Sequence, residues 1–175
     1  MNQGETWEKI SEDLTQGAKE GNVAFGTIST ISESKFQFGL LYAGSDDGKI
    51  HVSKDGGATW QLISNALPQD FWVSLIVASA HKKERVYTTL NGYRNDIFES
   101  FVFVSEDFGA NWKAISTGLT NAVNVIVEDS ANENILYVGT DNGLFISLDK
   151  GTSWQDFSNG MPKVAVHDAV IQTKS

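Results

Sequence analysis

Three stretches of the chain share an alternation of apolar positions that is typical of strands covered on both faces. They end at Ser53, Ser105 and Ser147. The residues one and three positions before each serine are apolar, namely Val52 and Ile50, Val104 and Val102, and Ile146 and Leu144. Because side chains alternate across a strand, these lie on one face. The opposite face carries His51, Phe103 and Phe145. Each strand is therefore predicted to lie in a sheet packed between two neighbours.

Further strand patterns group into three units of four strands, which we expect at residues 25–64, 73–116 and 123–158. Runs rich in β-branched and aromatic residues alternate with turn sequences such as Asp47-Gly48, which is typical of β-hairpins. Residues 4–11 match the last strand of each unit, and residues 164–173 match the first. We expect these to be an orphan outer strand and an orphan inner strand. No helix of consequence is predicted.

A turn motif, Ser-x-Asp-x-Gly-x-(Thr/Ser/Asn)-Trp, follows the third strand of every unit. It spans residues 53–60, 105–112 and 147–154, and its second half recurs at residues 4–7. A spacing of roughly 40–50 residues indicates a repeat architecture. The Asp can accept hydrogen bonds from backbone N–H groups, the Gly supplies a positive φ, and the Trp is an apolar anchor. We interpret the repeated residues as structural: Ser53, Asp55, Gly57, Trp60, Ser105, Asp107, Gly109, Trp112, Ser147, Asp149, Gly151 and Trp154.

These motifs resemble Asp-box (BNR) repeats, which sialidases, sortilin-type receptors, xyloglucanases and a photosystem assembly factor share. The sequence around them, such as Leu136-Tyr137-Val138-Gly139-Thr140, is similar to the late blades of large bacterial BNR-repeat glycosyl hydrolases. The resemblance covers nearly the whole chain. It implies an all-β fold, a β-propeller segment of four-stranded antiparallel blades, with three complete blades and two orphan terminal strands in residues 1–175. Since one architecture carries hydrolases, receptors and assembly factors, the resemblance does not choose among them.

Composition excludes several classes of partner and site. The net charge is −9, which argues against nucleic acid or an anionic membrane as a partner, because either needs a basic face. The chain has no cysteine, hence no disulfide and no thiolate nucleophile, and its three histidines are scattered. We expect no metal and no cofactor. No signal peptide is visible at the N-terminus, and the resemblance suggests a secreted or periplasmic parent protein.

The candidate ligand-binding residues come from loops that the resemblance places on one face, where ligands of the family usually bind. They are Asp46, Asp47, Trp72, Tyr93, Arg94, Asn95, Asp96 and Asp141. The loop of residues 91–99 is the longest between a second and a third strand. Arg94 and Asp96 suit hydrogen bonding to a polar ligand such as a sugar, and Tyr93 or Trp72 suits stacking. Alternatively, Arg94 and Asp96 pair with each other or with a neighbouring loop and only hold the insertion.

Counting residues bears on the enzyme hypothesis. A sialidase-type site resembles three arginines around a substrate carboxylate, whereas this chain has only Arg85 and Arg94, which we assign to opposite faces. A xyloglucanase-type site needs two facing carboxylates, for which Asp46, Asp96 and Asp141 are available. We expect no catalytic residues and a scaffold or binding module for a protein or glycan ligand. The alternative is a fragment of a glycoside hydrolase whose catalytic residues lie partly or wholly outside this chain.

The ends of the segment predict association. Three blades are too few to close a propeller ring, so the first and third sheets would expose apolar residues such as Ile28 and Phe145. We therefore expect a homo-oligomer, most simply a two-fold dimer, or contact with the missing blades of a parent chain.

Overall fold

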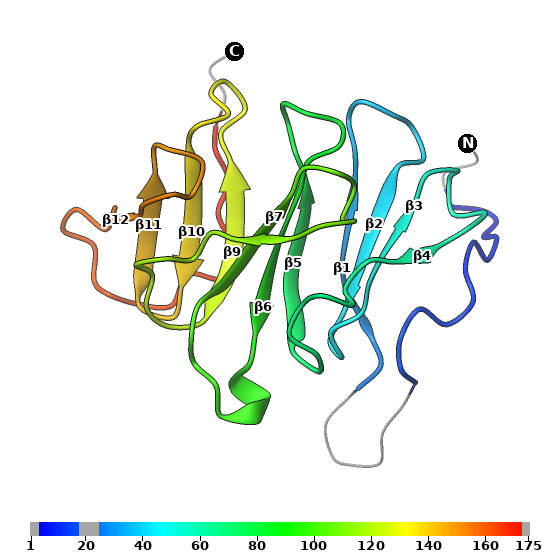
Figure 1. Ribbon diagram of the computed structural model, residues 1–175, viewed down its shortest axis with the longest axis horizontal. Coiled ribbons are helices and arrows are strands. Elements are labelled where there is room, and N and C mark those ends of the chain that lie inside the picture. Colours follow the sequence, from blue (N-terminus) through cyan, green and yellow to red (C-terminus); the bar gives the residue numbers. More distant parts are fainter. Residues whose placement is uncertain (1–3, 18–24, 173–175) are drawn as a thin grey trace.

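In the computed structural model, which describes residues 4–17 and 25–172, the chain forms three four-stranded antiparallel sheets in succession (Figure 1). The first holds β1 (Ile28–Glu33), β2 (Leu41–Ser45), β3 (Ile50–Ser53) and β4 (Gln61–Leu62). The second holds β5 (Trp72–Ala78), β6 (Val86–Asn91), β7 (Phe101–Ser105) and β8 (Lys113–Ala114). The third holds β9 (Val123–Glu128), β10 (Leu136–Thr140), β11 (Gly143–Ser147) and β12 (Gln155–Asp156). The predicted all-β class with three such sheets is confirmed.

Helix is nearly absent from the described ranges. One 3-10 turn, η1 (Tyr93–Asn95), interrupts the loop between β6 and β7. Within the described residues, no helix has the length and apolar character needed to cross a membrane.

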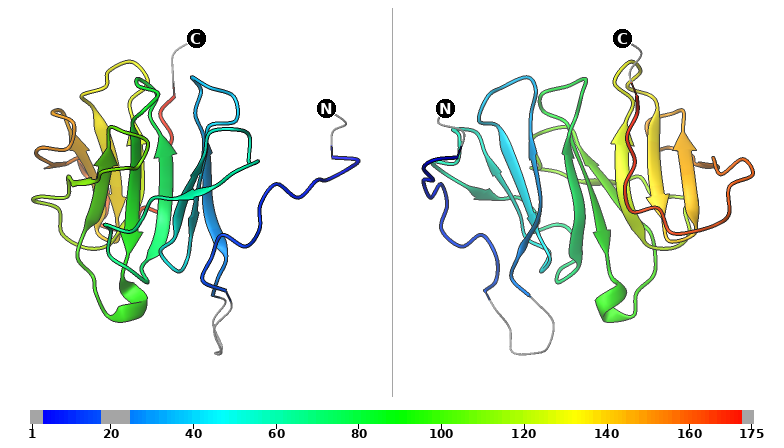
Figure 2. Two further views of the ribbon diagram at one scale, coloured as in Figure 1. Left: turned by 45° about the vertical axis from the view of Figure 1, so that its right-hand side comes forward. Right: turned by 180° about the vertical axis from the view of Figure 1, so that it is seen from behind.

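The core lies in two layers between the sheets, which stand side by side in both views of Figure 2. Tyr42 and Ile50 of the first sheet pack with Val73 and Leu90 of the second. The layer between the second and third sheets contains Tyr87, Val102, Val123, Ile126 and Val138. Burial of each large side chain is worth about 1.5–3 kcal/mol, so the apolar alternation of the third strands has its energetic basis in these layers.

A bulge in the first strand of the first and second sheets links each of them to the next sheet. Ser29 and Ser74 are the extra residues in β1 and β5, where the pairing with the second strand shifts by one. The Ser29 hydroxyl donates to the Val73 carbonyl at 2.8 Å, and the Ser74 hydroxyl donates to the Val123 carbonyl at 3.0 Å. Because the same bulge makes the same contact twice, successive sheets stack in one register.

The repeated motif closes the turn between the third and fourth strands of each sheet. In the second sheet the Ser105 hydroxyl donates to Asp107 at 2.7 Å and accepts from the buried Gly109 N–H at 2.8 Å. Asp107 also accepts from the Asn111 N–H at 2.8 Å. The other two boxes have the same contacts. The hydroxyl thus satisfies the buried donor, and the carboxylate braces the exposed side of the turn.

The second and third boxes also rest on the residue that follows the outer strand of the preceding sheet. The Trp112 indole Nε1 donates to the Ile63 carbonyl at 2.8 Å, and Trp154 donates to the Ile115 carbonyl at 2.6 Å. Gly109 sits so close that a Cβ there would lie 2.3 Å from the Ile63 side chain. We call this contact, the box tryptophan and glycine of one sheet against the isoleucine of the previous one, the box joint.

Neither terminal segment forms a regular strand, contrary to the expectation. Residues 4–11 have no inner strands beside them to complete a ladder, yet the Ile10 carbonyl accepts from Trp60 Nε1 at 2.9 Å, as in the other box joints. At the other end the Val166 N–H donates to the Thr140 carbonyl at 2.9 Å. Residue 173 of the expected inner strand lies outside the described residues. Both segments occupy strand positions without the partners that would make them strands.

Phe145 differs from the expectation of an exposed sheet end. It pairs with the fully buried Val138 and packs on the layer between the second and third sheets. The third strand of this sheet therefore turns its aromatic side chain inward. Ile28, at the opposite end of the stack, is 43% exposed, as expected.

Candidate binding face

The loops that follow second and fourth strands meet at one end of the stack, the end of Figure 1 where the short coil of η1 lies. A Cβ at Gly48, in the β2–β3 turn, would lie 3.0 Å from the backbone nitrogen of Asp70, in the β4–β5 loop. The Asn95 side chain of η1 donates to the Asp70 carbonyl at 3.4 Å. Three loops from two sheets thus form one continuous surface, which we call the loop face.

Arg94 lies at the centre of the loop face. Its Nη1 is 3.1 Å from Asp46 Oδ2 across the boundary between the first two sheets. Its guanidinium carbon is 6.0 Å from the Trp72 ring centroid, and Trp72 meets Tyr93 edge-to-face at 6.2 Å. The pKa of Arg94 is raised by its interaction with Tyr93 and, next, by the hydrogen bond and charge of Asp46. Four predicted site residues therefore form one cluster.

The two aspartates of the β2–β3 turn are committed to internal contacts. Asp46 Oδ1 accepts from the Thr27 N–H at 2.8 Å, while its Oδ2 faces Arg94. Asp47 is fully buried and accepts from the Ser45 hydroxyl and, at 2.6 Å, from the Gln16 N–H. Each carboxylate oxygen thus already has a donor, which is the behaviour of a structural turn.

The remaining predicted residues play separate parts. Asp96 ends η1 in the left-handed region at φ 58° and donates its N–H to the Tyr93 carbonyl. Arg94 forms its ion pair with Asp46 of the neighbouring turn. Asp141, on the third sheet, accepts from Asn124 Nδ2 at 2.8 Å. Asn124 in turn accepts from Asn91 Nδ2 at 3.3 Å. This amide chain is distinct from the Arg94 cluster.

Trp72 carries a donor with no partner in the described part of the chain. Its Nε1 is buried and makes no hydrogen bond there. Orphaned buried donors are rare in proteins. The indole sits between Arg94 and Tyr93, which is 45% exposed.

Sequence reasoning missed a buried charge network at the opposite end of β6. Arg85 is 5% exposed and reaches Glu106 at 2.7 Å, Glu133 at 2.9 Å and Glu128 at 3.4 Å. Glu128 also accepts from the Tyr87 hydroxyl at 2.9 Å. Burial, followed by the charge of Glu128, raises the pKa of Tyr87. The network joins the second and third sheets, and a charged residue inside a predicted buried strand, Glu128, was its signal.

The acidic and histidine side chains bear on whether the chain could hold a metal ion. The described residues contain no group of three or more His, Asp or Glu side chains arranged to hold a metal ion.

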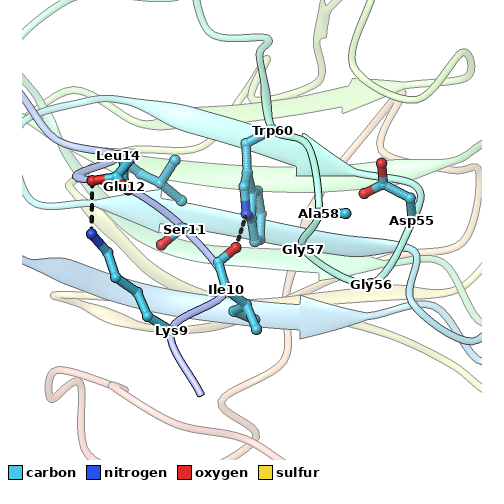
Figure 3. A pocket seen from close by; sticks show the side chains of 10 residues that line it. All are labelled: Lys9, Ile10, Ser11, Glu12, Leu14, Asp55, Gly56, Gly57, Ala58 and Trp60. Carbon is cyan, nitrogen blue, oxygen red and sulfur yellow. Dashed lines mark hydrogen bonds and ion pairs between the residues drawn. The ribbon is translucent and has the colours of Figure 1, made fainter.

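A groove of about 620 Å³ runs between residues 9–14 and the first box, lined by Ile10, Trp60 and Asp55 (Figure 3). Figure 3 also shows the Lys9–Glu12 ion pair at its rim. The groove lies beside the first box joint, at the open end of the stack, and far along the chain from Arg94.

Comparison with known proteins places this geometry among β-propellers. The BNR/Asp-box repeat family matches residues 51–62, which include the first box. The vacuolar protein sorting/targeting protein 10 of Colletotrichum graminicola is 36% identical over 70 residues, 38% of this chain and 4% of that protein. A GH74 xyloglucanase from Xanthomonas campestris superimposes with a TM-score of 0.61 at 17% identity, over 78% of this chain and 24% of that one. A structure of YCF48 bound to D1 peptide superimposes with a TM-score of 0.57 at 15% identity, over 79% of this chain and 45% of that one.

The chain thus spans less than half the length of each of these proteins. At such low identities the solved structures show the fold alone. This chain carries a BNR/Asp-box repeat, and its three sheets are blades of the β-propeller type.

Proposed function

We propose that the chain is a non-catalytic propeller module that binds a polar ligand, a peptide segment or a glycan, on the loop face around Arg94. The observation that carries the proposal is the Trp72–Tyr93–Arg94 cluster. It combines an exposed aromatic ring, a cation held in place by Asp46, and a buried indole donor that has no partner among the described residues. Aromatic and arginine side chains that are already positioned bind with little loss of conformational entropy.

The state of the carboxylates supports binding over hydrolysis. A glycosidase needs one carboxyl group to protonate the leaving group and a second to act as base or nucleophile. Both oxygens of Asp46 and of Asp47 already accept hydrogen bonds from the protein. Asp141 accepts from Asn124 and belongs to another network. Among the candidates of the loop face, these contacts favour a structural role.

The similar proteins do not decide between binding and hydrolysis. One of them is a xyloglucanase, and another was solved with a bound peptide. Arg85 and Arg94 lie at opposite ends of β6, so they cannot grip one carboxylate together. The proposal therefore rests on the side chains of the loop face that can bind a ligand, Trp72, Tyr93 and Arg94.

Binding to a glycan array and to a peptide array tests the proposal. We expect ligands on one array whose affinity falls at least about tenfold in Tyr93→Ala and in Arg94→Gln, as for interface anchors. Phe38→Ala is the matched control, because Phe38 is an aromatic residue 91% exposed in the β1–β2 loop at the other end. Equal loss in all three variants would contradict the assignment.

A hydrolysis assay on xyloglucan and on a fluorescent sialoside tests the alternative. We expect no release of sugar above a buffer blank. Turnover that disappears in Asp46→Asn or Asp141→Asn would overturn the non-catalytic assignment and favour the hydrolase fragment.

A further inference from the structure

The N-terminus carries half of a box joint that nothing in the described chain fills. Gly4 has φ +88°, within the range of the box glycines Gly57, Gly109 and Gly151 at +95°, +89° and +83°. Trp7 follows Gly4 at the spacing of the box tryptophans. Whereas those tryptophans are partly buried and donate to the backbone of a preceding segment, Trp7 is 89% exposed. Gly4 thus has the φ of a box glycine, while the side chain of Trp7 lies exposed.

The opposite end carries the matching half. Phe157 follows Trp154 by three residues, as Ile63 follows Trp60 and Ile115 follows Trp112. Its N–H donates to the Leu144 carbonyl at 2.8 Å, which repeats the Ile63–Ile50 contact at 2.8 Å. Ile63 and Ile115 lie under a box and are only 7% and 4% exposed, but Phe157 is 44% exposed. Phe157 therefore presents the surface on which a further box would rest.

The C-terminal segment marks where the inner strand of a further sheet belongs. A Cβ at Gly139 would lie 2.7 Å from the Val166 side chain, as one at Gly44 would lie 2.6 Å from Val73 of β5. Val166 thus occupies against the third sheet the place that the first strand of the second sheet occupies against the first. Figure 2 shows the red C-terminal segment alongside β9 and β10 and the dark blue N-terminal segment beside β4 at the other end of the stack.

We propose that a second copy of this chain docks head to tail, with its Gly4–Trp7 half-box seated on Phe157 and its Trp7 Nε1 donating to the Phe157 carbonyl. The occupant is a second copy because one chain carries both halves of the joint: Gly4 with the φ and the tryptophan spacing of a box glycine, and Phe157 with the backbone contact of Ile63. The two ends of the stack expose further apolar side chains, Ile31 in β1 at one end and Val164 and Val170 in the C-terminal segment at the other. Burying them adds a hydrophobic contribution to association.

The size of propeller rings selects two copies. A head-to-tail contact either closes a ring or grows a filament. Two copies contribute six complete sheets and two shared positions, each with residues 164–172 of one copy inside and residues 4–11 of the other outside. Eight positions lie within the ring sizes of about 4–8 blades, and a third copy would exceed them. Because only the inner and outer strands of a shared position are present, we expect a micromolar dimer. This proposal is independent of the loop face.

Sedimentation velocity of the full chain between about 1 and 200 μM tests the joint. We expect a concentration-dependent dimer, and Trp7→Ala should weaken it at least about tenfold, as for a buried interface tryptophan. The matched control is Phe98→Ala, an exposed aromatic on the loop face, which should leave dimerisation unchanged. A wild-type monomer at all concentrations, or a Trp7→Ala chain that dimerises like the wild type, would overturn the proposal.

Mixing two variants distinguishes a head-to-tail joint from a face that pairs with itself. Trp7→Ala keeps an intact Phe157 surface, and Phe157→Glu keeps an intact half-box. Each alone should associate more weakly than the wild type, while a fluorescently labelled mixture should associate more strongly than either variant alone, through the one intact joint. Absence of association in the mixture would contradict the head-to-tail arrangement. Thermal melts verify that Phe157→Glu is folded, and Phe157→Ser replaces it if its melting temperature falls.

Discussion

Replacing Ser105 by alanine should destabilise the protein more than replacing Asp107, although the aspartate gives the motif its name. Ser105 is 1% exposed, and its hydroxyl is the acceptor for the buried Gly109 N–H at 2.8 Å. Without it this donor loses its partner inside the protein, which costs about 1–3 kcal/mol. For a chain of this length that corresponds to a fall in melting temperature of roughly 2–12 °C.

Asp107→Ala removes contacts of another kind. Asp107 accepts from the N–H and the side chain of Asn111 on the exposed side of the turn, where water can replace the carboxylate. The Ser105 hydroxyl remains available to Gly109. The smaller effect follows from this difference in burial.

Urea denaturation of both variants checks the order. Ser130→Ala, an exposed serine outside the boxes, is the control and should stay within about 0.5 kcal/mol of the parent. An Asp107→Ala loss equal to or greater than that of Ser105→Ala would refute the assignment of the buried donor to the hydroxyl.

Three further predictions use the same measurement of unfolding. Glu128→Gln should cost about 2–3 kcal/mol, less than the 3–5 of a fully broken buried pair, because Arg85 keeps Glu106 and Glu133; an unchanged midpoint would contradict a role in joining the sheets. Hydrogen bonds from Lys150 and Arg85 lower the pKa of Glu133 to about 2. The stabilisation that Glu133 gives the folded protein is therefore present above its ordinary pKa of 4.5 and lost as pH falls toward 2. In Glu133→Gln the free energy of unfolding should therefore depend less on pH between those values than in the wild type. Equal dependence on pH in the two proteins would contradict this role. Gly109→Ala should destabilise by about 1–3 kcal/mol more than Gly118→Ala, because both have φ near +90° but only Gly109 meets a neighbouring side chain; equal losses would place the whole effect in the backbone.

The box motif made the fold predictable, since its spacing and the alternation before each serine depend on neighbours close in the chain. The bounds of the outer strands were harder to predict from the sequence. At the end of the unit expected at residues 25–64, the fourth strand β4 has only two residues, because the box occupies the preceding positions and β4 has a strand on one side only. The terminal segments show the same dependence, as a strand-like sequence forms no strand where its partners are missing.

The site was only partly predictable because its contacts cross between sheets. The sequence indicated that Arg94, Trp72 and Tyr93 share a face, and it left open whether Arg94 pairs with Asp96 or with a neighbouring loop. The 3.1 Å contact with Asp46 depends on how two sheets stack. The Arg85–Glu128 network is also a contact between sheets, and its two members lie 43 positions apart in the sequence. The charged Glu128 within a strand signals a buried partner, but no local pattern identifies that partner as Arg85.

Hydrogen exchange of the tryptophan indole N–H groups, followed by NMR on ¹⁵N-labelled protein, tests the box joint directly, since each of the five tryptophans gives one signal. The Nε1 protons of Trp60, Trp112 and Trp154 donate to carbonyls in the joints and should exchange slowly. The exposed Trp7 should exchange fast at low protein concentration and slow down as the dimer forms. Exchange of Trp112 and Trp154 as fast as that of Trp7 in the dilute protein would contradict the repeated joint on which the account of fold and association rests.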